Sequence, residues 1–212
     1  MLSLAEVGPA VAVERMAQAL RGGGVVVLPT DTVYGLAALP GDRAATDRLF
    51  ALKGRAATSP LAVLCTDVDQ ALGLSDPEVA DAVRAVAERW WPGPLTLVVA
   101  RRAGVALHLG EPDTTVGLRV PNHVVVRALT AAVGPIAATS ANRHGEPTPT
   151  TAADAAAALG ADVALVVDGG PLATTASTVV DATVEPWAIL RDGPVPGTEV
   201  VAVARASLGE PR

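Results

Sequence analysis

Side chains that could bind an anion lie in four short segments of this sequence, each beside a predicted strand or helix end. Residues 29–36 read Pro-Thr-Asp-Thr-Val-Tyr-Gly-Leu and follow a predicted buried strand. Two hydroxyls, a carboxylate and the only tyrosine come together there, and ligands often bind outside the ends of strands. The competing interpretation is an Asx-type turn, in which these side chains satisfy their own backbone.

A second segment holds Lys53 and Arg55 on either side of Gly54, the predicted end of a helix. The chain has 16 basic residues, and Lys53 is the only lysine among them. A compact ammonium beside a planar guanidinium suits a polyphosphate, because one acts as a point charge and the other as a donor fork. The alternative is a basic helix end that complements the helix dipole, which explains Lys53 but not Arg55.

The third segment is Thr-Ser-Ala-Asn at residues 139–142, directly after a predicted strand. Small hydroxyl residues there can donate to a phosphate, or they can form a capping turn.

The fourth group is scattered over predicted strands and consists of Thr115, Arg119, residues 177–178 and Arg191. Each of the two arginines ends an apolar strand, where a buried charge requires an anionic partner. That partner is either a ligand or a protein carboxylate, such as Asp168 or Asp181.

Together these segments predict a site for an anionic ligand, most simply a nucleotide phosphate with a carboxylate. Phosphoryl and nucleotidyl transfer need mainly positioning and charge neutralisation, so a catalytic triad is not required. The sequence has no Walker-type phosphate loop and no dinucleotide-binding glycine fingerprint. Its three histidines, His108, His123 and His144, lack the spacing of zinc ligands, and we identify no metal-binding side chains.

Composition narrows the class of protein further. Half of the 212 residues are hydrophobic, which disfavours disorder, and the net charge of −6 disfavours a broad nucleic-acid-binding surface. The single cysteine, Cys65, excludes an intramolecular disulfide and suits a reducing compartment. The sequence shows no signal peptide and no membrane-length apolar run, so we expect a cytoplasmic protein without membrane contact.

Helical and strand patterns alternate along the chain and must position these segments. The predicted helices cover residues 9–21, 43–53, 75–89, 122–131 and 151–159. The predicted strands cover residues 25–28, 61–65, 95–101, 115–120, 136–139, 163–167, 178–181 and 187–191. This order predicts an α/β (α+β) fold, a single domain over residues 9–194 with a twisted mixed sheet flanked by helices. Residues 195–212 are weakly patterned and are expected to form a loosely attached tail.

Seven motifs in order resemble one family. They are PTDTVYGL at 29–36, K-x-R at 53–55, WPGPLT at 91–96, LRVP at 118–121, TSAN at 139–142, STVVD at 177–181 and ILRDG at 189–193. With these motifs the chain resembles the YrdC-like family, the L-threonylcarbamoyladenylate synthases, over residues 9–194. It looks like the short, single-domain form.

The resemblance implies that L-threonine, bicarbonate and ATP are joined into threonylcarbamoyl-AMP and pyrophosphate, with Mg²⁺ beside the phosphates. Downstream tRNA-modification enzymes would then pass the group to the adenosine next to the anticodon, and a transient contact with tRNA is part of this expectation. It also implies a YrdC-like fold with a concave, positively charged cavity.

The resemblance further assigns residues to the two substrates. The threonine-binding set is Thr32, Arg119, Ala138 through its backbone, and Ser177. The ATP-binding set is Arg55, Ser59, Thr115, Ser140, Thr148 and Arg191. Lys53 and Arg55 would be catalytic, and they would neutralise the departing pyrophosphate.

Two other functions remain open at this point. One is a carbamoyl-adenylate-handling enzyme on the same scaffold. The other is a non-catalytic RNA-binding or ribosome-associated module, because the cavity could accept a nucleotide of RNA.

Overall fold

The structure is a computed structural model that describes residues 1–54, 60–172 and 175–207. Its helices are α1 Leu4–Arg21, α2 Arg43–Lys53, α3 Val68–Leu72, α4 Ala80–Trp90, α5 Val124–Val133, α6 Ala152–Leu159 and α7 Gly197–Ser207, with a 3-10 turn at Pro77–Val79. Its strands are β1 Leu2–Ser3, β2 Val26–Pro29, β3 Tyr34–Ala38, β4 Ala62–Leu64, β5 Leu95–Ala100, β6 Thr115–Arg119, β7 Ile136–Ser140, β8 Leu165–Asp168, β9 Thr178–Asp181 and β10 Ala188–Arg191.

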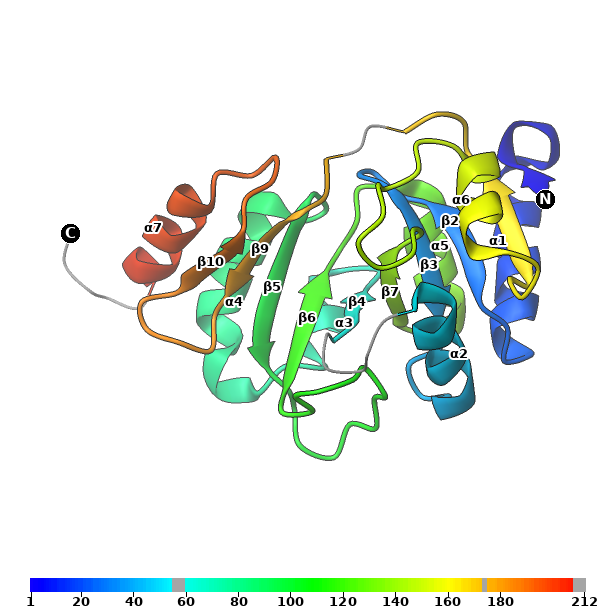
Figure 1. Ribbon diagram of the computed structural model, residues 1–212. Coiled ribbons are helices and arrows are strands. Elements are labelled where there is room, and N and C mark those ends of the chain that lie inside the picture. Colours follow the sequence, from blue (N-terminus) through cyan, green and yellow to red (C-terminus); the bar gives the residue numbers. More distant parts are fainter. Residues whose placement is uncertain (55–59, 173–174, 208–212) are drawn as a thin grey trace.

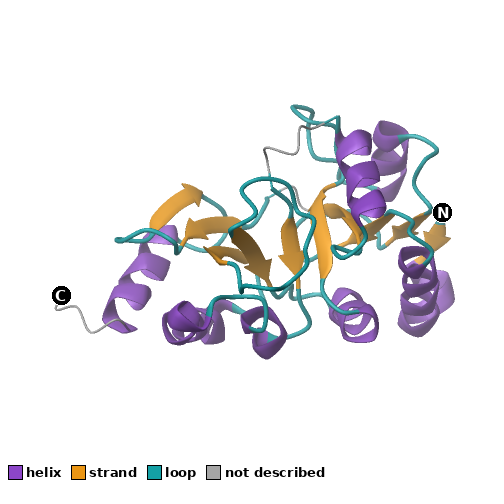
Figure 2. Cartoon of the chain, turned by 90° about the horizontal axis from the view of Figure 1, so that it is seen from below, coloured by secondary structure: helices purple, strands orange, loops and turns teal. Residues whose placement is uncertain are grey.

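The strands form one mixed sheet in the order β1-β8-β2-β3-β7-β4-β6-β5-β9-β10. Parallel pairs such as β4 with β6 and β5 with β9 alternate with antiparallel pairs such as β5 with β6. Helices α1, α3, α4 and α5 lie along one face, whereas α2 and α6 cover the other face only near β2 and β3 (Figures 1 and 2). The predicted α/β fold with a mixed sheet is confirmed.

Two groups of apolar side chains hold these layers together. Helices α1 and α5 bury residues such as Met16 and Leu129 against Leu28 and Ile136 of the sheet. The larger group extends from α2 and α6 to α3, α4 and α7. Tyr34, the only tyrosine, lies fully buried at the start of β3, with its hydroxyl donating to the Gly170 carbonyl at 2.6 Å. Tyr34 is therefore a buried structural residue, and it supports the turn at residues 29–34.

Helix α2 positions Lys53 as its sequence predicts. The Asp42 carboxylate accepts a hydrogen bond from the Ala45 amide at 3.1 Å, which caps the first turn. Gly54 ends the helix with φ of 60°, a left-handed conformation that glycine adopts without strain. Both boundaries follow from the sequence, and they bring the Lys53 side chain to the buried side of the helix.

Several local predictions were wrong in detail. Residues 34–38 form a strand, β3, rather than the end of a polar loop, because β2 and β7 both pair with them. The helix predicted over residues 9–21 is present, but a kink at Gly8 joins it to a further turn that starts at Leu4. Asp76 Oδ1, not Ser75, accepts the capping hydrogen bond from the Glu78 amide. Residue His123, not Asn122, precedes α5, and its side chain makes no capping hydrogen bond.

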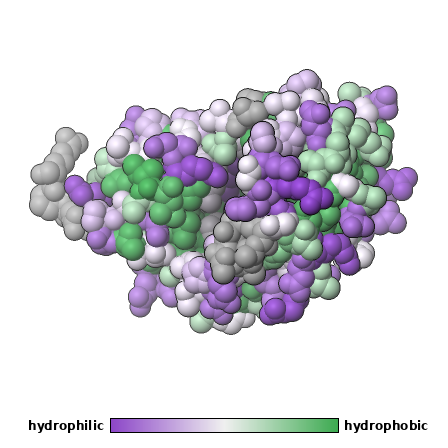
Figure 3. All heavy atoms as spheres, viewed as in Figure 1, coloured by the Kyte–Doolittle hydropathy of each residue, from purple (hydrophilic) through white to green (hydrophobic). Residues whose placement is uncertain are grey.

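The expectation of a loosely attached tail differs from the structure. Helix α7 packs on α4 and on β9, with Val200 and Ala204 buried. Apolar side chains also gather on the face over β9 and β10 (Figure 3), where Ile189 and Leu190 are exposed. Within the described ranges, no helix is long and apolar enough to cross a membrane.

Candidate active site

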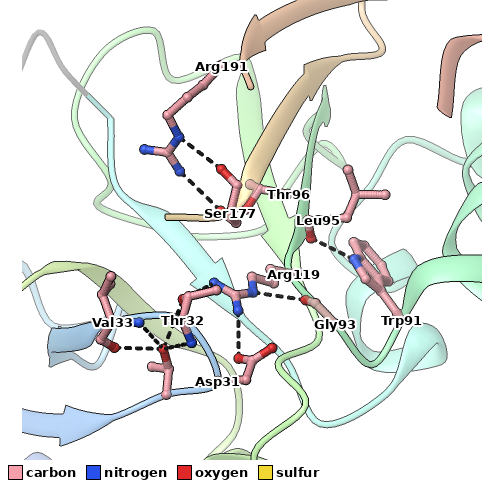
Figure 4. Close-up of polar contacts among 11 residues, drawn as sticks. Asp31, Thr32, Val33, Trp91, Gly93, Leu95, Thr96, Arg119, Ser177 and Arg191 are labelled. Atoms are coloured by element: carbon pink, nitrogen blue, oxygen red, sulfur yellow. Dashed lines mark hydrogen bonds and ion pairs between the residues drawn. The ribbon is translucent and has the colours of Figure 1, made fainter. Parts of the chain in front are cut away.

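The turn between β2 and β3 is held by its own hydroxyl group. Thr30 Oγ1 accepts hydrogen bonds from the Thr32 and Val33 amides, each at 3.1 Å, and donates to the Val33 carbonyl at 2.7 Å. The predicted turn interpretation of this segment is therefore correct for Thr30. It leaves the neighbouring side chains of Asp31 and Thr32 directed toward the end of β6 (Figure 4).

Arg119 ends β6 and brings a guanidinium into this space. Its Nη1 donates to Thr32 Oγ1 at 3.0 Å, its Nη2 lies 2.6 Å from Asp31 Oδ1, and its Nε donates to the Gly93 carbonyl at 3.1 Å. Burial lowers the pKa of Arg119, and the ion pair with Asp31 opposes that effect. The carboxylate partner is thus Asp31, and the predicted alternatives, Asp168 and Asp181, were wrong for Arg119.

Asp168 and Asp181 instead accept hydrogen bonds from amides in the loops that follow their strands. Asp168 Oδ1 accepts from the Gly170 amide at 2.9 Å, and Asp181 Oδ1 accepts from the Thr183 amide at 2.8 Å.

A second guanidinium lies on the other side of Arg119 (Figure 4). Arg191 Nε donates to the Ser177 carbonyl at 2.9 Å, and its Nη2 donates to Ser177 Oγ at 3.1 Å. Ser177 Oγ lies 2.9 Å from Thr96 Oγ1 on β5. Burial lowers the pKa of Arg191, and the positive charge of Arg119 lowers it further. The two guanidiniums therefore lie close enough to repel each other.

Lys53 is directed toward the end of β7. Its Nζ lies 2.7 Å from the Ser140 carbonyl and 3.1 Å from Ser140 Oγ. It also lies 2.6 Å from the Asn142 carbonyl and 2.9 Å from Asn142 Oδ1. The side chain is 3% exposed, so this ammonium organises residues 140–142 from within the protein. Lys53 also lies in the last turn of α2, as the helix-dipole interpretation requires.

A cavity of about 540 Å³ adjoins the Arg119 cluster. Asp31 and Thr32 line one side, and Trp90, Trp91 and the prolines of the 92–94 segment line another. Another cavity of about 310 Å³ lies between α2 and residues 106–111, and Arg43, Arg101 and three acids surround it. Only the first of these two is lined by a residue of the predicted substrate sets, Thr32, and it adjoins the Arg119 cluster, so it is the candidate active site.

A comparison with protein families decides the relationship. The Sua5/YciO/YrdC family model, described as "Telomere recombination", matches residues 18–193. The chain belongs to the Sua5/YciO/YrdC family. A protein of Mycobacterium leprae, provisionally named threonylcarbamoyl-AMP synthase, is 42% identical over 194 residues, which cover 90% of this chain and 88% of that protein.

More distant members of the family are named threonylcarbamoyl-AMP synthase without that qualification. Threonylcarbamoyl-AMP synthase of Pyrococcus abyssi is 37% identical, over 87% of this chain and 54% of that protein. The crystal structure of P. abyssi Sua5 complexed with L-threonine superposes with a TM-score of 0.83 at 36% identity, covering 94% of this chain and 58% of that one. The chain thus spans somewhat more than half of the archaeal protein. The predicted YrdC-like fold is confirmed.

The structure brings four of the family-derived residues together. Thr32 and Arg119 share a hydrogen bond, as do Ser177 and Arg191. Ser140 contacts Lys53. Among the described residues, the cluster thus combines members of both the threonine and the ATP sets.

The other predicted residues lie elsewhere on the strands and loops or outside the described ranges. Thr115 begins β6, so its backbone is about 13 Å from Arg119 at the usual strand rise. Ala138 is in the middle of β7, paired with Ala37 and Ala62. Thr148 is half-buried in the loop before α6. Arg55 and Ser59 lie outside the described residues.

Four residues outside the predicted substrate sets contact members of those sets. Asp31 and Asn142 lie in the predicted polar segments but had no assigned role, and Gly93 and Thr96 were missed. All four lie inside the quoted family motifs, which was the available signal, but a motif does not tell which side chain faces a neighbour. No three His, Cys, Asp or Glu side chains in the described part of the chain gather as a metal site.

Proposed function

We propose that this protein is an L-threonylcarbamoyladenylate synthase, a nucleotidyltransferase that joins L-threonine, bicarbonate and ATP into threonylcarbamoyl-AMP and pyrophosphate. The observation that carries the proposal is the buried Arg119 cluster beside a cavity, in a chain 36% identical to a protein crystallised with L-threonine. The relatives named threonylcarbamoyl-AMP synthase support the same reaction. The product would supply tRNA-modifying enzymes, and we propose that the protein works with them in the cytoplasm.

The threonine side of the proposed site consists of Thr32, Arg119, Ser177 and the backbone of Ala138. A guanidinium fork matches a carboxylate, so Arg119 would hold the α-carboxylate of the amino acid. Thr32 Oγ1 already lies 3.0 Å from the same guanidinium and would contact the bound amino acid beside it. Burial of Arg119 strengthens this recognition, because the low local dielectric makes a charged hydrogen bond worth more.

The ATP side would consist of Arg55, Ser59, Thr115, Ser140, Thr148 and Arg191. Arg191 donates two hydrogen bonds to Ser177, which belongs to the threonine set. This link supports a geometry in which the two substrates lie side by side. Such an arrangement lowers the entropic cost of bringing a carbamate to the α-phosphorus.

The chemistry then needs positioning and charge neutralisation. A carbamate oxygen of carboxylated threonine attacks the α-phosphorus of ATP, and the bond to the bridging oxygen of pyrophosphate breaks. The carbamate oxygen is already anionic, so this step needs no general base. Lys53 and Arg55 would stabilise the leaving group, Lys53 from its place against Ser140. Mg²⁺ would enter with ATP, since the described residues offer no cluster to hold it, and no step here depends on it.

Labelled bicarbonate tests the proposal. The protein is incubated with [¹⁴C]bicarbonate, ATP and L-threonine, and the label is followed into a nucleotide product while pyrophosphate release is measured. We expect label in a nucleotide only when ATP and threonine are both present.

A substitution tests the threonine side of the site. Arg119→Lys, which keeps the charge and loses the fork, should raise the KM for threonine at least tenfold. Arg84→Lys, at an exposed ion pair with Asp69, is the control and should leave turnover unchanged.

Two results would contradict the proposal. Product formed from carbamoyl phosphate, with none from threonine, would assign the protein to carbamoyl-adenylate handling. Tight RNA binding without any pyrophosphate release would assign it to a non-catalytic RNA-binding role.

A further inference from the structure

Asp31 places a carboxylate where the proposed function has so far assigned nothing. Its side chain is 12% exposed and lines the 540 Å³ cavity, and its Oδ1 lies 2.6 Å from Nη2 of Arg119. The backbone of the turn does not depend on it, because Thr30 Oγ1 holds that turn. A carboxylate that is partly removed from water and remains at a cavity wall is available to a ligand.

The pair of charges matches an amino acid zwitterion. An α-amino acid carries its carboxylate and its ammonium on one carbon atom, so its two charges lie a few ångströms apart. Arg119 and Asp31 present the opposite charges at a comparable separation. An amino acid that gives its carboxylate to Arg119 therefore brings its ammonium close to Asp31. Within the described residues, Asp31 is the acid that forms an ion pair with Arg119.

The proposed reaction also requires a proton acceptor at this ammonium. An amine attacks the carbon of bicarbonate or carbon dioxide through its lone pair, which protonation removes. Arg119 and Arg191 are guanidiniums and stay protonated. Lys53 is directed toward Ser140 and Asn142. Asp31 is the base among the described groups that line this part of the cavity.

We propose that Asp31 binds the α-ammonium of the amino acid substrate and takes one of its protons before carboxylation; this rests on the proposed function. The proton passes from nitrogen to a carboxylate oxygen of Asp31. The neutral amine then attacks bicarbonate, a nitrogen–carbon bond forms, a carbon–oxygen bond breaks, and water leaves. Asp31 returns its proton to solvent through the cavity. No oxidant or reductant takes part.

Several charged or titratable groups lie near Asp31. Arg119 approaches from β6, and Arg191 on β10 lies beyond it. Arg89, at the end of α4, lines the same cavity. His123, before α5, also senses Asp31, but burial lowers the pKa of this histidine and favours its neutral form.

Asp31→Asn tests the proposal, because the amide keeps the shape and can still accept a hydrogen bond from Arg119. Proton acceptors of this kind contribute roughly 100- to 10,000-fold to a rate. We therefore expect kcat/KM for threonine to fall at least about 100-fold at pH 7, with the KM for ATP unchanged. The loss should shrink as the pH rises toward 9, since free threonine then carries a neutral amine. Asp31→Glu should recover part of the activity, and Asp69→Asn, at an exposed ion pair, should change nothing.

A loss in Asp31→Asn that is the same at every pH would overturn the proposal, because a positioning role through Arg119 predicts that pattern. Full activity of Asp31→Asn at pH 7 would overturn it as well. Circular dichroism and thermal unfolding check that the variant folds, and Asp31→Glu keeps the test open if it does not.

A binding measurement separates this proposal from the proposed function. Calorimetry compares L-threonine with 3-hydroxybutyrate, which keeps the carboxylate and the hydroxyl but lacks the amine. The wild-type protein should bind threonine at least tenfold more tightly, and Asp31→Asn should remove most of that preference. If the wild type makes no labelled nucleotide yet shows this pattern, the proposed reaction fails while the role of Asp31 in binding the ammonium stands. An unchanged preference in Asp31→Asn refutes that role whether or not the wild type turns over.

Discussion

Replacing Lys53 by methionine tests whether its ammonium holds a loop or acts on phosphates. Methionine keeps most of the length of the side chain and removes the charge and every donor. In the structure, Lys53 Nζ lies within 3.1 Å of four oxygens of Ser140 and Asn142, and the side chain is 3% exposed. The variant therefore leaves several buried acceptors without their donor.

The expected cost follows from these contacts. Removing one partner from a buried charged network destabilises a protein by about 3–5 kcal/mol. For a domain of this size, each kcal/mol lowers Tm by about 2–4 °C, so the Tm of Lys53→Met should fall by about 6–20 °C. Arg43→Met, at the exposed start of the same helix, is the matched control and should change stability by no more than about 0.5 kcal/mol.

Two assays on the same preparations separate the two roles. Thermal unfolding reports the loop-holding role, and pyrophosphate release at a temperature where the variant is folded reports the catalytic one. Turnover should fall far more than threonine binding, because the 140–142 segment belongs to the proposed ATP side. An unchanged Tm with lost pyrophosphate release would refute the structural reasoning. An unchanged rate with a lowered Tm would remove Lys53 from the reaction.

Three further predictions rest on single groups. Arg191→Lys keeps the charge but loses the fork, so the KM for ATP should rise about tenfold with threonine affected less; steady-state pyrophosphate release measures this, and equal rises would contradict it. Burial lowers the pKa of His123, with Asp31 opposing, so the unfolded chain takes up the proton first as the pH falls below about 6.5. The free energy of unfolding should therefore decrease from pH 7 toward pH 5, and His123 should contribute at most about 1.4 kcal/mol per pH unit to this decrease. Urea unfolding should show a flatter profile in His123→Asn, and an identical profile would refute the assignment. Burial raises the pKa of Cys65 to about 12, so a thiol reagent should label it only after unfolding, and rapid labelling of the native protein would contradict this.

Patterns of neighbouring residues predicted most of the helices and strands. Helix α2 begins after Asp42 and ends at Gly54 as expected, because capping and the left-handed glycine are determined by neighbouring residues. Strand β9 also has the predicted bounds. Strand β3 was missed because its residues, Tyr-Gly-Leu-Ala-Ala, have weak strand preference, and pairing with β2 and β7 decides their conformation. Helix α7 was missed for a related reason, since its packing on α4 stabilises it.

The types of residue at the site were predicted from the sequence, but the partners that these residues contact were predicted less well. Sequence reasoning found that Arg119 needs an anion but proposed Asp168 or Asp181, which follow strands much later in the chain. The partner is Asp31, 88 positions earlier, on the β2–β3 turn, which reaches the end of β6 although β7 and β4 lie between β3 and β6 in the sheet. Lys53 was likewise recognised as unusual, while its contacts with Ser140 and Asn142 depend on the approach of α2 to β7. Pairing across the sheet is long-range information that no local pattern carries.

The net charge of −6 describes the whole chain and not the cavity. Burial lowers the pKa of both Arg119 and Arg191, and Arg119 adds to the effect on Arg191, so keeping these two positive charges close together and away from water costs free energy. Among the described acids, Asp31 offsets that cost by pairing with Arg119. A ligand that brings several negative charges removes the remaining repulsion when it binds, whereas a neutral ligand of the same shape does not. The repulsion between these two partly desolvated guanidiniums is thus a physical reason to expect anions to bind beside them, and it would be lost if either guanidinium faced bulk water.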